Sequence, residues 1–344
     1  MRILIVQTAF IGDCILTTPL IRRAREAFGE PDDILVVLST PEGAQVFDNN
    51  PCIDELIIYD KRRRETGLRT FFGLARRLLE RRFDIAVLPH RSFRTGLLSF
   101  MARIPRRVGF TGAPGEVFYT DKIVRPIGLP EAERMVVLLK VIGKNAEPCL
   151  TEVFPGDARR NKATDFLKNA GIAADTKFIT VAPGSVWGTK RYPAEKYAEA
   201  IDIILEKGLV KAAVIIGGKD DRKLCERIVE LANYRVVSAA GIGDILISAA
   251  IIEKSALFIG NDSAPGHLAA AVGTPVVCIL GPTIPDFGFI PYTSKVRVIE
   301  PERELRCRPC GPHGKMKCPR GDHLCMTSIA PERVVYAAGE LLGE

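Results

Sequence analysis

The 344-residue sequence is long enough for two domains, and its 47% apolar and 26% charged residues are typical of a globular protein. No uncharged apolar run approaches the length of about 18 residues that a membrane-spanning helix needs. The formal net charge of +7 is modest, but a dense basic run over residues 61–82 favours an acidic partner, either nucleic acid or anionic lipid.

The first residues predict a β-strand and not a signal peptide. The apolar run over residues 1–6 ends at Gln7, and no small-residue cleavage site follows it. We therefore expect the protein in the cytoplasm, where its nine cysteines would stay reduced and form no disulfide framework.

Short β-branched runs alternate with helical patterns along the chain, as in parallel sheets covered on both faces. Strands are predicted at residues 3–7, 34–38, 56–59, 84–89, 178–182, 212–217, 235–238, 257–260, 276–280 and 296–299. Helices are predicted at residues 18–28, 68–81, 158–170, 194–207, 221–232, 265–272 and 330–342, and the glycines of residues 109–115 predict a loop.

This alternation predicts two doubly wound, Rossmann-like α/β domains, residues 1–155 and 156–344. The boundary falls where the alternation lapses and Pro148, Pro155 and Gly156 occur. We expect the domains to face each other across a cleft lined by the carboxyl ends of their strands. The last helix could cross back to the first domain.

The segment of residues 9–19 follows the first strand and opens a helix. Gly12 permits a tight turn, which would place Asp13 at the carboxyl end of the strand. A carboxylate there can act as a general base, or it can accept hydrogen bonds from the first turn of the helix. The spacing alone leaves both interpretations open.

The segment of residues 182–193 leaves the first strand of the second domain. Its Ser185, Thr189 and Lys190 supply hydroxyl groups and a positive charge, which suit a diphosphate. A basic surface loop before a helix is the alternative.

The segment of residues 258–271 carries the strongest signal, because polar residues at a strand end precede a helix of small residues. The free N–H groups of a helix N-terminus bind anions, and small residues allow close approach of a ligand. Asp262 and Ser263 could be ligand contacts or ordinary helix caps. Gly266 and His267 follow in the first turn, where the histidine could face phosphates or be structural.

A third strand end, over residues 215–221, turns into a helix through two acidic residues. Asp220 or its neighbour could accept hydrogen bonds from a ribose hydroxyl, or both could be first-turn acids that favour the helix.

Four cysteines lie close together in the sequence near the C-terminus, at Cys307, Cys310, Cys318 and Cys325. Such a set could bind a structural zinc ion, although the spacing differs from that of a standard zinc ribbon. Reduced cysteines packed in a loop, or disulfides of the kind found in thermophile proteins, are the alternatives, and no catalytic role is expected.

In the basic run, residues 68, 71, 72, 75, 78 and 79 are apolar and recur at helical spacing. They predict a helix face that packs on the sheet, with the arginines directed outward. These arginines, together with Arg62, Arg63 and Arg64, could be merely solvated, or they could contact a phosphorylated acceptor or an anionic membrane.

Taken together, the motifs resemble glycosyltransferase family 9, the ADP-heptose:lipopolysaccharide heptosyltransferases. The resemblance rests on Gly12-Asp13 with Thr17-Thr18-Pro19, on residues 183–190, on Asn261-Asp262-Ser263 with His267-Leu268-Ala269-Ala270, and on Gly281-Pro282-Thr283. The loop at residues 185–189 and the cysteine tail look most like the heptosyltransferase II branch. Ala264 departs from the pattern, since the family often has glycine there.

The resemblance implies a GT-B fold and an inverting transfer of heptose from ADP-heptose to the inner core of a lipopolysaccharide precursor. It makes Asp13 the base, with Gly12 and Thr17 on the acceptor side. Lys190 and the helix after Asp262 would hold the diphosphate, and Asp262 would reach the sugar. No cofactor is required, and the lack of an Asp-x-Asp tripeptide agrees with metal-free chemistry. The expected membrane contact is peripheral, on the inner face of the inner membrane.

Three other functions remain as alternatives. A sugar-nucleotide epimerase can share the two-domain fold, and an iron–sulfur redox module could form at the cysteines. A nucleic-acid-binding protein would use the basic run, but that run lacks the exposed aromatic residues that such a surface needs, so no nucleic-acid partner is expected.

Overall fold

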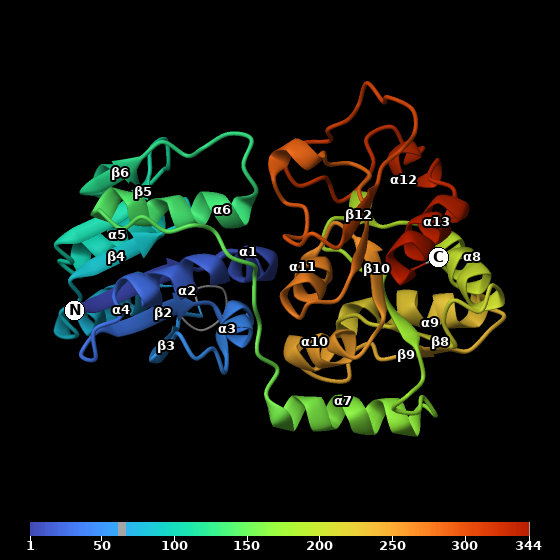
Figure 1. The fold of residues 1–344 in the computed structure, drawn as a ribbon. Helices are drawn as coiled ribbons and strands as arrows, with labels where there is room; N and C mark the ends of the chain where they lie inside the picture. The colour runs from blue at the N-terminus through green and yellow to red at the C-terminus, as the bar shows by residue number, and fades with distance from the viewer. Residues whose placement is uncertain (61–66, 344) are drawn as a thin grey trace. The chain divides into compact units, whose positions relative to one another are not determined.

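The computed structural model describes residues 1–60 and 67–343, and the chain divides into two compact units, Met1–Phe154 and Pro155–Glu344. Each unit is a six-stranded parallel sheet with helices on both faces, as Figure 1 shows. The predicted α/β class is therefore confirmed. The division falls one residue before the predicted boundary.

In the first unit the strand order is β3-β2-β1-β4-β5-β6, so the direction of winding reverses between β1 and β4. Apolar β-branched runs form the central strands because both of their faces are buried. The strands are β1 (Arg2–Gln7), β2 (Ile34–Ser39), β3 (Glu55–Ile58), β4 (Ile85–Leu88), β5 (Arg106–Phe110) and β6 (Asp121–Ile123). The helices are α1 (Ile11–Leu16), α2 (Thr18–Ala27), α3 (Pro41–Phe47), α4 (Leu68–Glu80), α5 (Phe93–Met101) and α6 (Glu131–Val136), with the 3-10 turns η1 (Glu116–Phe118) and η2 (Val137–Ile142).

Helices α4 and α5 pack against each other and share one buried cluster with the sheet. Phe71, Leu74 and Leu78 of α4 and Leu98 of α5 face this core. The sequence prediction for α4 was partly wrong, because Leu68, Phe72 and Leu79 are exposed and do not pack on the sheet. Phe71, Leu74, Ala75 and Leu78 already fill the inward stripe.

Strands β5 and β6 were not predicted from the sequence, whose glycines indicated a loop over residues 109–115. Gly109 instead lies in β5, where the ring of Tyr119 leaves no room for a side chain, since an added Cβ would approach Tyr119 to 2.2 Å. The two strands are short and begin with charged residues, which weakens the apolar signal.

The second unit repeats the architecture with the order β12-β11-β10-β7-β8-β9, and its winding reverses between β7 and β10. The last helix, α13, lies in this unit and packs against α8. The strands are β7 (Phe178–Ala182), β8 (Ala212–Ile215), β9 (Val236–Ser238), β10 (Leu257–Asn261), β11 (Val276–Ile279) and β12 (Val296–Ile299). The helices are α7 (Asp157–Asn169), α8 (Ala194–Glu206), α9 (Arg222–Leu231), α10 (Ile245–Glu253), α11 (Ala264–Ala271), α12 (Leu324–Thr327) and α13 (Pro331–Leu342), with the 3-10 turns η3 (Gly188–Lys190), η4 (Lys219–Asp221) and η5 (Pro285–Phe287).

After β12 a long loop runs to α12. The loop contains Cys307, Cys310 and Cys318, and Cys325 lies in α12 itself. Among the described residues, none of the helices has the length and apolarity needed to cross a bilayer.

Candidate active site

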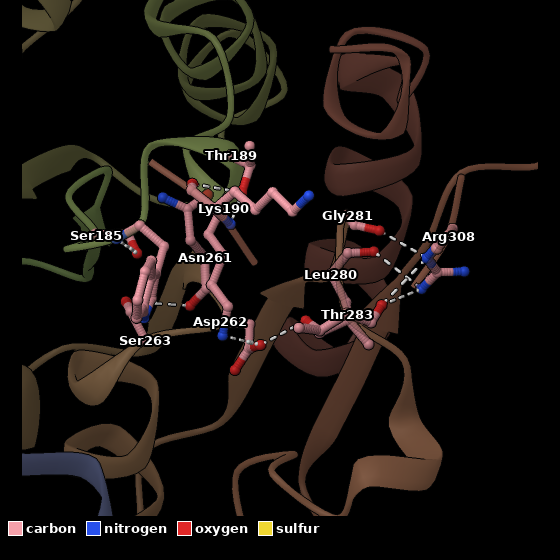
Figure 2. Close-up of polar contacts among 12 residues, drawn as sticks. Ser185, Thr189, Lys190, Asn261, Asp262, Ser263, Leu280, Gly281, Thr283 and Arg308 are labelled. Atoms are coloured by element: carbon pink, nitrogen blue, oxygen red, sulfur yellow. Dashed lines mark hydrogen bonds and ion pairs between the residues drawn. The ribbon is translucent and has the colours of Figure 1, made fainter. Parts of the chain in front are cut away.

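A buried ion pair lies where the winding of the second sheet reverses. Asp262 directly follows β10, and its Oδ2 accepts hydrogen bonds from Lys190 Nζ at 2.5 Å and from Thr283 Oγ1 at 2.7 Å. All three side chains are less than a tenth exposed. They come from the loops after β7, β10 and β11, which are neighbours in the sheet (Figure 2). Ligands of open parallel sheets bind at this kind of position.

Asn261 at the end of β10 fixes the loop that carries Lys190. Its Oδ1 accepts from the backbone N–H of Tyr192 at 3.1 Å and from the hydroxyl of Tyr197 at 3.0 Å, and its Nδ2 donates to the carbonyl of Pro183 at 2.8 Å. The side chain is fully buried. Both ends of the loop are thereby held against β10, which sets the position of Lys190.

The N-terminus of α11 is not capped by a side chain. Ser263 occupies the N-cap position, but its Oγ donates to the carbonyl oxygens of Gly184 and Asn261. The carboxylate of Asp262 is taken up by Lys190 and Thr283, so the capping alternative for both residues is not realised. Pro265 has no N–H and the N–H of Gly266 donates to the carbonyl of Ser263 at 3.0 Å, so the positive potential beside the ion pair comes from the end of the helix dipole.

His267 is buried in the first turn of α11, and burial lowers the pKa of its imidazole to about 4. The charge of Lys190 lowers it further, while Asp262 opposes the shift. The ring is therefore neutral at pH 7, and its Nδ1 has no hydrogen-bond partner within the described residues. Such a group can bind a ligand without adding charge.

The loop before Lys190 is held partly by itself and partly by the cysteine-containing tail. Ser185 Oγ accepts from the N–H of Trp187 at 3.2 Å. Thr189 Oγ1 donates to the carbonyl of Lys315 at 2.8 Å and accepts from its N–H at 2.7 Å. The tail therefore occupies the Thr189 hydroxyl in this structure, and its predicted contact with a diphosphate stays a prediction.

The tail is anchored on the loop after β11. Arg308 donates to the carbonyl oxygens of Leu280, Gly281 and Thr283 (Figure 2). It also pairs with the carboxylate of Glu300. Thr283 is the residue that bonds Asp262, so the tail also supports the ion pair.

The four clustered cysteines line one cavity of about 290 Å³ together with Thr189 and Arg308. Burial raises the pKa of the Cys325 thiol to about 11, and the three other cysteines raise it further, which places all four near one another. No three His, Cys, Asp or Glu side chains in residues 1–60 and 67–343 are arranged to hold a metal ion. The structural zinc site stays a prediction.

The acidic pair after β8 takes two different positions. Asp220, the predicted ribose contact, is exposed. Asp221 Oδ2 accepts from the N–H of Gly218 at 3.1 Å, and its carboxylate lies so close to Gly184 that an added Cβ would approach it to 2.5 Å. Asp221 therefore supports the loop after β7, and the role of Asp220 stays a prediction.

In the first unit, Asp13 lies in α1, just after β1 and at the reversal of that sheet. Its Oδ2 accepts a long hydrogen bond of 3.3 Å from the N–H of Phe10, so Asp13 does interact with its own helix start. The environment nevertheless disfavours its charge. Burial, followed by the negative charge of Glu131, raises the pKa of Asp13 to about 6.

Glu131 belongs to an ion-pair network that the sequence analysis missed. It is buried at the start of α6 and pairs with Arg125 and with Arg134, the latter at 3.1 Å. Glu131 raises the pKa of Asp13, and Arg125 of the same network opposes that shift.

The residues predicted on the acceptor side lie in different surroundings. Gly12 lies in α1 next to Asp13. Thr17 is fully buried, and its Oγ1 donates to the carbonyl of Asp13 and accepts from Gln7 Nε2, both at 2.7 Å. It supports Asp13 from inside the unit, which corrects its predicted contact with an acceptor. Arg62, Arg63 and Arg64 lie outside the described residues.

Comparison with known proteins gives a consistent result. The model of the family described as glycosyltransferase family 9 (heptosyltransferase) matches residues 71–318. Lipopolysaccharide heptosyltransferase 2 of Salmonella typhimurium is 26% identical over 366 aligned positions, covering 100% of this chain and 99% of that protein.

Two solved structures resemble the whole chain. The glycosyl transferase family 9 structure from Veillonella parvula is 26% identical, with a TM-score of 0.89. The match covers 99% of this chain and 97% of that one. The structure of E. coli ADP-heptose lps heptosyltransferase II is 22% identical, with a TM-score of 0.79. The match covers 99% of this chain and 98% of that one.

The raised pKa of Asp13 predicts a pH-dependent stability difference. A carboxyl group whose pKa rises on folding binds its proton more tightly in the folded state, so its destabilising effect is absent near pH 4 and complete above about pH 6. We expect Asp13→Asn to raise the free energy of unfolding at pH 7.5 by roughly 1–3 kcal/mol, and with it the melting temperature by a few degrees. The gain should disappear at pH 4. Thermal melts of both proteins across this range test it, and an equal or lower melting temperature at pH 7.5 would contradict it.

Proposed function

The chain belongs to glycosyltransferase family 9 and has its GT-B fold, and we propose that it transfers heptose from ADP-heptose to the inner core of a lipopolysaccharide precursor. The observation that supports this most directly is the buried Lys190–Asp262 pair beside the uncapped N-terminus of α11. Relatives named lipopolysaccharide heptosyltransferase 2 match the chain over its full length, and one solved relative is named for ADP-heptose.

The donor diphosphate would bind at Lys190 and α11. An ammonium group has three N–H bonds, and Asp262 uses one of them, which leaves two for phosphate oxygens. As the glycosyl–phosphate bond breaks, charge accumulates on the leaving diphosphate, and the fixed Lys190 ammonium group and the dipole of α11 stabilise that charge without reorganisation. Asp262, held by Lys190 and Thr283, would orient the sugar.

Asp13 would act as the general base in an inverting reaction. The carboxylate accepts the proton of the acceptor hydroxyl as that oxygen attacks the anomeric carbon on the face opposite the diphosphate. A pKa of about 6 suits this role, since the group is ionised at neutral pH and yet basic enough to take a proton. Glu131 acts on it from α6 as a positioning and tuning residue.

The reaction would need no metal ion, because protein groups supply the positive charge at the diphosphate. The enzyme would work in the cytoplasm at the inner face of the inner membrane, where its lipid-linked acceptor resides. Neither the fold nor the comparisons favour the epimerase, the redox module or the nucleic-acid-binding protein.

Lys190→Met should weaken ADP binding by about 10- to 100-fold and lower turnover with it, because one charge-assisted contact is lost in the ground state and in the transition state. Methionine keeps the length of the side chain. Lys196→Met is the matched control, since Lys196 bonds the carbonyl of Ile329 and not Asp262. Calorimetric ADP titration measures both variants. Unchanged affinity in Lys190→Met would remove this lysine from the donor site.

Asp13→Asn should lower kcat by about 10²- to 10⁴-fold while ADP affinity stays level, because only the proton acceptor is lost. For the wild-type protein, log kcat/KM should rise with pH until about pH 6 and then level off, as Asp13 ionises. Glu131→Gln should shift this limb to lower pH, since it removes a negative charge near Asp13. If Asp13→Asn has the kcat of the wild-type protein, Asp13 is not the general base.

Excess EDTA should leave initial rates of transfer unchanged after a short incubation. The metal content of the purified protein, measured in parallel, shows whether the four cysteines hold zinc. Immediate loss of activity that Mg²⁺ restores would contradict metal-free transfer. Slow loss accompanied by zinc release would place a metal in the tail as a stabilising element.

A further inference from the structure

The outer side of α4 carries apolar side chains that no core residue covers. Leu68, Phe72 and Leu79 are 77%, 50% and 38% exposed and lie beside the buried stripe of the helix that fills the core. Arg69 and Arg76 lie between them on the same outer side. The helix therefore has one buried apolar stripe, and its exposed part carries both apolar and cationic side chains.

The neighbouring helix α5, which packs against α4, carries exposed apolar residues of its own. Phe93 and Phe100 are 51% and 52% exposed, and their ring centroids lie 5.3 and 5.5 Å from that of Phe118 in η1. Val117 beside Phe118 is 78% exposed. The guanidinium of Arg107 lies 5.6 Å from the ring centroid of Phe100. Three phenylalanines thus form a packed and pre-ordered apolar cluster at the surface.

Charge on these elements has one predominant sign. Besides Arg107, the exposed arginines of these elements and of their ends are Arg69, Arg76, Arg77, Arg91 and Arg103. The two acidic residues of the surface are engaged locally, since Glu80 pairs with Arg76 at 3.0 Å and Glu116 with Lys122 at 3.5 Å. The partner that fits is therefore anionic and apolar at once.

We propose that the outer face of α4, α5 and η1 is the surface by which the protein lies on an anionic lipid bilayer. The phenylalanines and leucines would enter the boundary between headgroups and acyl chains, and the arginines would contact lipid phosphates. The inference rests on the proposed function to the extent that a lipid-linked acceptor explains why the enzyme needs such a surface.

Two other partners fit less well. A second copy of the chain would bring two arginine-rich faces together around a two-fold axis, where like charges repel. Single-stranded nucleic acid needs open aromatic faces for stacking, whereas Phe93 and Phe100 pack against Phe118 and the outer residues of α4 are mostly aliphatic.

Flotation of the full-length protein with two kinds of vesicle tests the proposal: phosphatidylcholine alone, and phosphatidylcholine with about one third phosphatidylglycerol. The wild-type protein should float with the anionic vesicles, release at high salt, and stay unbound with phosphatidylcholine alone. The double variant Phe93→Ser/Phe100→Ser and the double variant Arg69→Glu/Arg103→Glu should each lose about tenfold or more of the bound fraction. Phe72→Ser provides an independent test on α4.

Tyr336→Ser and Lys223→Glu are the matched controls, since both residues are exposed on helices of the second unit. They should bind vesicles as the wild type does. The proposal is overturned if the wild-type protein ignores anionic vesicles, if the surface variants bind like the wild type, or if the same variants lose only self-association or single-stranded DNA binding.

Failure of the membrane-surface proposal can be distinguished from failure of the proposed function. The surface variants should transfer heptose to a delipidated core oligosaccharide at the wild-type rate, whereas Lys190→Met should bind vesicles normally and fail in transfer. Vesicle binding without any heptose transfer by the wild-type protein would uphold the surface and refute the function.

Discussion

The second unit is organised around the burial of one lysine beside one aspartate. Removing two charges from water costs several kcal/mol, and their mutual attraction repays this only with good geometry and further hydrogen bonds. Here Thr283 supplies one such bond and Asn261 holds the lysine loop in place. A pair of this kind adds little to stability. A ligand-binding role of the lysine would explain why the buried pair is present.

The first unit keeps an unfavourable arrangement of the same kind. Asp13 would be easier to accommodate if Glu131 were absent, yet Arg125 and Arg134 hold that second carboxylate in place. Thr17 adds support from below through the carbonyl of Asp13. In both units, buried polar side chains of the scaffold thus hold a charged group that apolar packing alone would exclude.

The sequence was sufficient for the fold class and for the main segments of the site, because strand ends followed by small or polar residues leave a local signal. Asp262, Lys190 and His267 come together as these signals predicted. Three features had no local signal: the bond from Thr189 to Lys315, the effect of Glu131 on Asp13, and the exposed side of Phe72. Each depends on residues distant in sequence or on how many apolar positions the core can hold. The short strand β5 was missed because arginines begin it.

The attachment of the tail to the loop after β7 has a consequence for biosynthesis. Thr189 and Lys315 are 126 residues apart, and α8 packs against α13, so the contacts that hold the loop after β7 form only after nearly all of the second unit has left the ribosome. The first unit is a continuous segment and can fold while the second is still being translated. During that interval the nascent second unit exposes an unfinished sheet, and this is the stage at which chaperones would be needed most.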